Sequence, residues 1–123
     1  MQLTPEQERV KAWLDAVPGA VGTPTGYKVM GKTFAILSIR RRDGCGWLIL
    51  KSDPHLAEIL REQYSGVGHR SHLDRRYWIA ITLGADVPDD EIERLIAQSY
   101  DLVCAGLTRK QRVELAALDG QPE

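Results

Sequence analysis

Two apolar segments joined by a short polar turn constrain the fold more than any other feature of this sequence. Residues 33–39 and 47–51 are rich in Ile, Leu and aromatic side chains, and Arg41-Arg-Asp-Gly44 lies between them. Asp-Gly pairs readily adopt the positive φ angles of a hairpin, and β-branched and aromatic residues favour strands. The pattern predicts an antiparallel pair in the middle of the chain. Both segments are apolar on both faces, so we expect the C-terminal helix or a second copy of the chain to cover part of the second face.

Capping signals predict four helices around these strands. Residues 4–7, Thr-Pro-Glu-Gln, form a capping box with Pro at the first helical position, and an apolar stripe follows over residues 10–17. Similar signals start helices near residues 52, 88 and 108. The expected buried faces comprise Leu56, Ile59, Leu60 and Tyr64 in the second helix, and Ile92, Leu95, Ile96, Ser99, Leu102 and Val103 in the third.

Two further apolar segments extend the expected sheet. Residues 27–30 predict a short strand, preceded by an irregular connector over residues 22–26. Residues 77–83 predict a strand in which Trp78, Ala80 and Thr82 share one face. Trp47 is expected beside them on another strand. The pattern as a whole predicts an α+β fold built on a meander of antiparallel strands.

Composition limits the setting in which the chain acts. A chain of 123 residues with 43% hydrophobic and 27% charged residues fits one soluble domain with its own core. Apolar runs are only a few residues long, so we expect no membrane span. Cys45 and Cys104 lie far apart and no leader pattern opens the sequence, which favours free thiols and a cytoplasmic protein.

The net charge of −1 conceals an uneven distribution along the chain. Residues 28–76 hold ten Lys or Arg against five Asp or Glu, whereas the flanks hold six basic and twelve acidic residues. If this separation became a basic face in the fold, that face would attract an anionic partner. A solvated surface of mixed charges is the other explanation.

The segment from Gly66 to Trp78 is the main candidate for function. It contains two histidines, three arginines and two aromatic residues in a loop that opens with glycine. Folding alone rarely requires so many polar groups beside aromatic rings, so we expect this loop to contact a partner.

Five short motifs in order resemble the MmcQ/YjbR family of small bacterial proteins. They are Gly31-Lys32-x-Phe34-Ala35, Leu50-Lys51-x-Asp53-Pro54, Arg61-Glu62-Gln63-Tyr64-x-Gly66, His72-x5-Trp78 and Ser99-Tyr100-Asp101-Leu102-Val103. The resemblance extends from the first helix to Arg112. It implies one domain over residues 1–118, followed by a flexible tail at 119–123. The implied fold is a CyaY-like (frataxin-like) two-layer sandwich, in which helices pack mainly on one face of a single antiparallel sheet. Tyr77 departs from the family pattern, which has His beside the Trp.

The resemblance also implies DNA binding through two projecting loops, a double wing. In this chain the wings correspond to the hairpin tip and to the loop at residues 69–76. Arginines there can pair with phosphates in a weak, salt-sensitive manner. The candidate nucleic-acid-binding residues are Arg40, Arg41, Arg42, Arg70, Arg75 and Arg76.

The alternative is a module for a small anionic ligand or a protein partner. It would use the sheet face and the adjoining loop, with His69, His72, Trp47 and Trp78 as ligand or interface residues. Aromatic residues on a sheet are also common core residues. The chain would be a monomer or a weak homodimer in either case.

Enzymatic and metal-binding functions find little support in the sequence. His69-x2-His72 resembles a ligand pair, but no third ligand has a diagnostic spacing, and no complete catalytic signature is present. We therefore expect no metal, no cofactor and no enzymatic activity.

Overall fold

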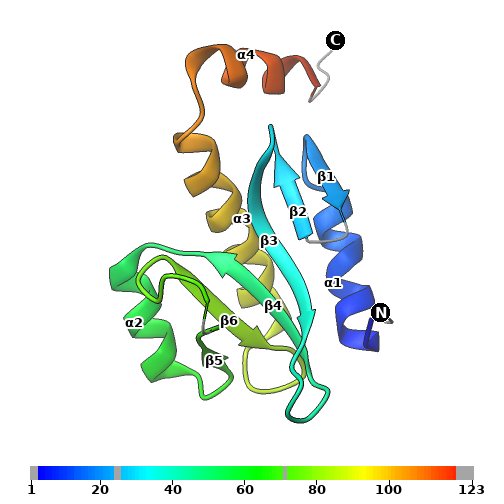
Figure 1. The fold of residues 1–123 in the computed structure, drawn as a ribbon, viewed down its shortest axis with the longest axis vertical. Helices are drawn as coiled ribbons and strands as arrows, with labels where there is room; N and C mark the ends of the chain where they lie inside the picture. The colour runs from blue at the N-terminus through cyan, green and yellow to red at the C-terminus, as the bar shows by residue number, and fades with distance from the viewer. Residues whose placement is uncertain (1–2, 24–25, 71, 119–123) are drawn as a thin grey trace.

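The computed structural model describes residues 3–23, 26–70 and 72–118, and it shows an α+β fold built on one open antiparallel sheet (Figure 1). The strand order is β1-β2-β3-β4-β6-β5, and each neighbouring pair is antiparallel. The predicted fold class is confirmed. The elements in chain order are α1 (Pro5–Asp15), β1 (Ala20–Thr23), β2 (Gly26–Val29), β3 (Lys32–Ile39), β4 (Gly46–Lys51), α2 (Pro54–Gln63), β5 (Val67–Gly68), β6 (Trp78–Thr82), α3 (Asp89–Ala105) and α4 (Arg109–Leu118).

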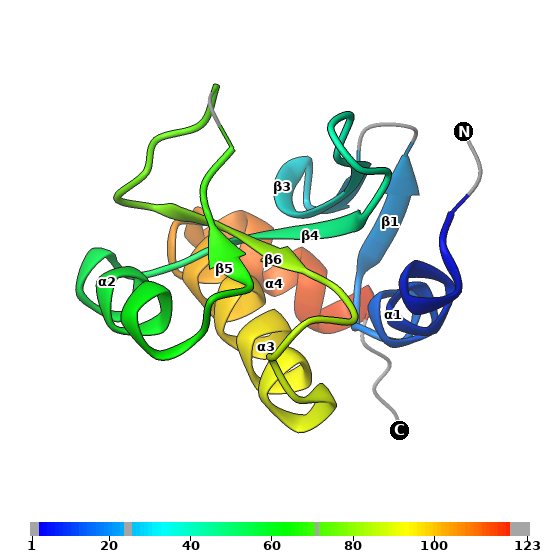
Figure 2. The same cartoon turned by 90° about the horizontal axis from the view of Figure 1, so that it is seen from below.

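The molecule has two layers, with the helices on one side of the sheet. Figure 2 shows α1, α2, α3 and α4 below the sheet, whereas the β3–β4 turn and the β5–β6 connection rise on the opposite side. The core fills the space between the layers and includes Leu48 and Leu50 of β4 and Ile79 and Ile81 of β6. The opposite face of the sheet, which we call the open face, lies on the side of the two loops.

Helix α4 lies with the other helices and does not cover the open face (Figure 2). Its Leu115 packs against the core, and a Cβ on Gly19, which has φ +75°, would collide with the Leu115 side chain. Over its described residues, the C-terminal helix is therefore excluded as a cover for the second face.

A buried glutamine ties α1 to the central hairpin. The predicted capping box is present, because Thr4 N donates to Gln7 Oε1 at 3.0 Å and Gln7 N donates to Thr4 Oγ1 at 3.2 Å. The Gln7 side chain is fully buried, and its Nε2 also donates to the carbonyls of Ser38 at 2.7 Å and Trp47 at 3.2 Å. One side chain thus caps a helix and fixes it to β3 and β4 where their hairpin begins.

The prediction missed the two edge strands. Ala20–Thr23 forms β1 and pairs with β2, although residues 22–26 were expected to be irregular, and β5 has only two residues. Pairing with a neighbour that lies elsewhere in the chain creates both strands, and a two-residue segment is too short to show periodicity.

Two expected core residues are exposed instead. Ile59 of α2 is 44% exposed and Leu102 of α3 is 37% exposed, whereas Ala57 and Leu60 form the buried face of α2. Successive helical residues are about 100° apart, which turns Ile59 away from the side that Ala57 and Leu60 share.

The flexible tail predicted at residues 119–123 lies outside the described residues. In the described parts of the chain, every helix is too short or too polar to cross a membrane.

Candidate nucleic-acid interface

The strand register places both candidate tryptophans on the open face. Trp47 of β4 pairs with Thr82 and Trp78 of β6 pairs with Lys51, so the two rings lie at opposite ends of the β4–β6 pair. Four residues along a strand span about 13 Å. Ile49 lies between the two positions and is fully buried. The tryptophans therefore share a face, but they belong to separate surfaces.

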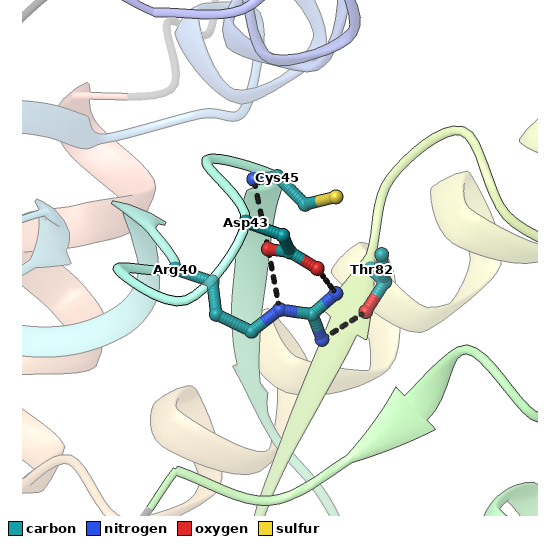
Figure 3. A network of polar contacts seen from close by, with 4 residues as sticks. All are labelled: Arg40, Asp43, Cys45 and Thr82. Carbon is teal, nitrogen blue, oxygen red and sulfur yellow. Dashed lines mark hydrogen bonds and ion pairs between the residues drawn. The ribbon is translucent and has the colours of Figure 1, made fainter.

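Arg40 anchors the β3–β4 turn rather than projecting from it (Figure 3). Its Nε donates to Asp43 Oδ1 at 2.9 Å, its Nη2 donates to Asp43 Oδ2 at 2.6 Å, and its Nη1 donates to Thr82 Oγ1 at 3.3 Å. The guanidinium carbon lies 5.6 Å from the centroid of the Trp47 ring. The hydrogen bonds from Arg40, followed by one from the backbone of Cys45, hold the pKa of Asp43 well below its usual range. The turn is fixed to β6, and the charge of Arg40 is balanced locally.

Arg41 and Arg42 follow directly and are exposed. Within the part of the chain that the structure describes, neither guanidinium forms an ion pair with a carboxylate. Because Arg40 and Asp43 neutralise each other, these two side chains supply the net positive charge of the turn.

Arg61 of α2 fixes the base of the second loop. Its Nη2 donates to the carbonyls of Arg75 at 2.8 Å and Trp78 at 2.9 Å, and its Nε donates to that of Gly68 at 3.4 Å. Partial burial is the first cause of a lowered pKa at Arg61. The sequence did not predict this role of Arg61, because hydrogen bonds to distant backbone carbonyls leave no sequence pattern.

Inside this loop, local contacts hold several of the candidate side chains. His69 Nε2 lies 2.8 Å from the carbonyl oxygen of Leu73, which can only accept, so this nitrogen carries the proton. Arg76 donates to Asp74 through Nε at 3.2 Å and through Nη2 at 3.1 Å. These bonds lower the pKa of Asp74. Arg76, like Arg40, is thus paired with a carboxylate.

A hollow of about 470 Å³ lies between the two loops on the open face, and we call it the inter-loop groove. Trp47 and Ala80 belong to neighbouring strands beneath it, and Gly68 lies on the edge strand. A Cβ added to Gly68 would meet no atom within 4 Å, so this position opens into free space. The lining residues are Arg40, Arg41, Arg42, Trp47, Ser65, Gly66, Gly68, His69, Ala80 and Thr82.

Asp86, which does not line the groove itself, holds the backbone of two residues at its edge. Its carboxylate accepts hydrogen bonds from the backbone N–H groups of Ser65 at 2.7 Å and Gly66 at 2.8 Å. A Cβ on Gly66 would lie only 2.7 Å from Asp86 Oδ1, so the contact requires glycine. The start of β5 is therefore held at one position beside the groove.

The inter-loop groove gathers five of the ten predicted site residues, and the others lie elsewhere. Arg75 and Arg76 line a separate hollow of about 320 Å³ with Arg61 and two glutamates. Trp78 lines a third hollow of about 550 Å³ with Lys51 and Tyr77. Arg70 and His72 line none of these three hollows, and His72 is exposed.

Over residues 3–23, 26–70 and 72–118, no cluster of three or more His, Cys, Asp or Glu side chains could hold a metal ion. Cys45 and Cys104 are free thiols, as predicted.

A family model and two curated relatives match this chain. The YjbR family model matches residues 4–102. The chain is 36% identical over 69 residues to the uncharacterized protein YjbR of Escherichia coli K12, a match that covers 56% of this chain and 58% of that protein. It is 28% identical over 86 residues to the uncharacterized protein YbdF of Escherichia coli O157:H7, which covers 70% of this chain and 69% of that one. The chain thus spans less than two thirds of the length of the YjbR relative.

Two crystal structures share the fold. A Deinococcus radiodurans protein with a DUF419 domain superposes with a TM-score of 0.77 at 28% identity, covering 98% of this chain and 96% of that one. A Pseudomonas syringae protein superposes with a TM-score of 0.62 at 21% identity, covering 81% of this chain and 98% of that one. With the family model matched over most of its length, this chain belongs to the YjbR family.

Proposed function

We propose that this protein binds DNA weakly, as a binding protein rather than an enzyme, through the inter-loop groove and the loops beside it. The observation that carries the proposal is the charge of the groove. Arg41 and Arg42 stand on one side without a described carboxylate partner, and His69 stands on the other. None of the described residues that line the groove is Asp or Glu. An anionic strand would meet the guanidiniums of Arg41 and Arg42 there without displacing an acidic side chain.

Two of the six candidate arginines are not free to bind phosphate, which limits the affinity. Arg40 and Arg76 are paired with carboxylates, so phosphates would have to compete for them. Of the four remaining arginines, Arg75 lines a separate hollow with two glutamates, so Arg41, Arg42 and Arg70 supply about three phosphate contacts. The logarithm of the affinity would fall with the logarithm of the salt concentration at a slope of roughly −2 to −3, on the rule of about 0.9 per contact. Because the net charge of the chain is −1, long-range attraction adds little.

The test is a fluorescence-anisotropy titration of labelled DNA at several salt concentrations. The double variant Arg41→Ser/Arg42→Ser should weaken binding and reduce the salt slope by about 2. The matched control is Arg109→Ser/Lys110→Ser, which removes two adjacent exposed cations from α4 on the other side of the sheet. Absence of binding by the wild-type chain at low salt would overturn the proposal, and so would equal losses in both double variants.

A second candidate function has support from the surface around Trp78. The hollow there combines Lys51 and Asp53 with the exposed aromatic ring of Tyr77 and the exposed side chain of Leu102. A small anionic ligand or a protein partner could use the ammonium group and the apolar walls together. Titration of candidate ligands against the fluorescence of the wild type and of Trp78→Phe tests this function. A signal change that Trp78→Phe retains in full would place the ligand elsewhere.

The same proposal includes a cellular compartment and an oligomeric state for binding. Free thiols at Cys45 and Cys104 suit a reducing compartment, so we place the protein in the cytoplasm. The groove lies within a single chain, so DNA binding would not require a second subunit.

A further inference from the structure

The geometry points to single-stranded rather than double-stranded nucleic acid as the partner of the inter-loop groove. One unstacked base lies in the groove beside Trp47, and the neighbouring phosphates lie at Arg41 and Arg42. This inference rests on the proposed function and specifies the form of nucleic acid that the site accepts.

The groove presents planar groups to its occupant. The guanidinium of Arg40 lies 5.6 Å from the centroid of the Trp47 ring, and its hydrogen bonds to Asp43 and Thr82 hold it there. The imidazole of His69 contributes a third planar group to the lining. Unstacked bases are bound in proteins by stacking on aromatic rings and on guanidinium planes.

Small residues create the space between the Arg40–Trp47 pair and His69. Gly68 pairs with Ala80 in the sheet, and no side chain fills the volume above Gly68. The groove volume of about 470 Å³ lies in the range of small-molecule sites, roughly 300–1,000 Å³. This is the scale of one nucleotide and not of a duplex.

A duplex could not use this space. Its bases are stacked and paired, and extruding one base costs a few kcal/mol. A duplex would therefore contact only the arginines of the loop tips, whereas a single strand gains the same phosphate contacts and a stacked base. Two hydroxyls also line the groove, and both already have a partner. Ser65 Oγ donates to Asp86 Oδ2 at 3.1 Å, and Thr82 Oγ1 accepts from Arg40 Nη1 at 3.3 Å.

The decisive variant is Gly68→Leu. Its side chain enters open space at a position without a positive φ, so the melting temperature should change little. Stacking contributes about 1–3 kcal/mol per base, so the loss of the base contact should weaken single-strand binding roughly 5- to 150-fold. Duplex binding should change less than about twofold, because the arginine contacts to phosphate remain. The matched control is Val21→Leu, an exposed position on β1 at the opposite edge of the sheet, which should leave both affinities unchanged.

A second measurement uses the wild-type chain and does not depend on the folding of any variant. An abasic single strand keeps its phosphates but has no base to stack, so it should bind more weakly than the parent strand by the same factor as Gly68→Leu. Equal affinity for the parent and abasic strands would overturn the inference, as would equal weakening of duplex and single strand by Gly68→Leu. DNA and RNA strands are compared in parallel. If duplex still binds in a salt-dependent manner, the proposed function stands, and if no nucleic acid binds at low salt, both fail.

Discussion

Replacing Arg61 by alanine should loosen the loop between β5 and β6 at its base. The Arg61 guanidinium joins α2 to three backbone carbonyls, at 2.8 Å for Arg75, 2.9 Å for Trp78 and 3.4 Å for Gly68. These carbonyls belong to both ends of the loop, so one side chain closes it. Arg61→Lys keeps the charge but loses the planar fork that reaches several acceptors at once.

The magnitude follows from the two short bonds. A hydrogen bond to a charged group contributes about 1.5–3 kcal/mol to stability. The freed carbonyl of Arg75 lies on an exposed residue and regains water, so the lower end applies and the third, longer bond adds little. The expected loss is roughly 2–3 kcal/mol of the free energy of unfolding. For a domain of this size it corresponds to a fall in melting temperature of about 8–12 °C.

Urea denaturation measures the loss, and hydrogen exchange locates it. Amides of residues 69–77 should exchange faster in Arg61→Ala, whereas those in the central strands should change only with the global stability. The control is Glu62→Ala, since Glu62 is the exposed neighbour of Arg61 and lines the same hollow. The reasoning is refuted if Arg61→Ala costs less than about 0.5 kcal/mol, or if residues 69–77 exchange as in the wild type.

Two further predictions concern the buried hydrogen bonds of Gln7 and the ionised carboxylate of Asp86. Gln7→Leu removes the donor for the carbonyls of Ser38 and Trp47, and should lower the free energy of unfolding by about 2–3 kcal/mol in urea denaturation; an unchanged midpoint would contradict this. Burial raises the pKa of Asp86, but the hydrogen bonds from the Gly66 and Ser65 backbones outweigh it, so the folded pKa is lowered. This contribution to stability is complete above the unfolded pKa of about 3.9 and is lost as the pH falls through the folded pKa. The melting temperature of Asp86→Asn should therefore fall less steeply than that of the wild type below about pH 4.

The elements that the sequence predicted correctly are those with local signals. The hairpin turn before Gly44, the capping boxes at Thr4 and Thr108, and the alternation around Trp78 all depend on residues within a few positions of one another. Such short-range chemistry determines helix starts and tight turns. Edge strands β1 and β5 depend on partners elsewhere in the chain, so they were missed.

For the candidate site, the sequence likewise predicted the loops but not the contacts that their side chains make. Sequence identified two loops rich in arginine, and Figure 2 shows both loops rising from the open face. It did not reveal that Arg40 and Arg76 are paired with carboxylates only two or three residues away. Those pairs depend on the turn geometry, because the same residues in an extended chain would not meet. The roles of Arg61 and Gln7 as bridges to distant carbonyls were likewise invisible.

Photo-cross-linking tests most directly whether the inter-loop groove holds the strand. A single strand that carries 5-iodouracil is irradiated with the wild-type chain at low salt, and mass spectrometry identifies the modified peptide. We predict attachment at Trp47 or His69, which line the groove. Attachment at Trp13 or Tyr100, which line a hollow among α1 and α3, would contradict the account.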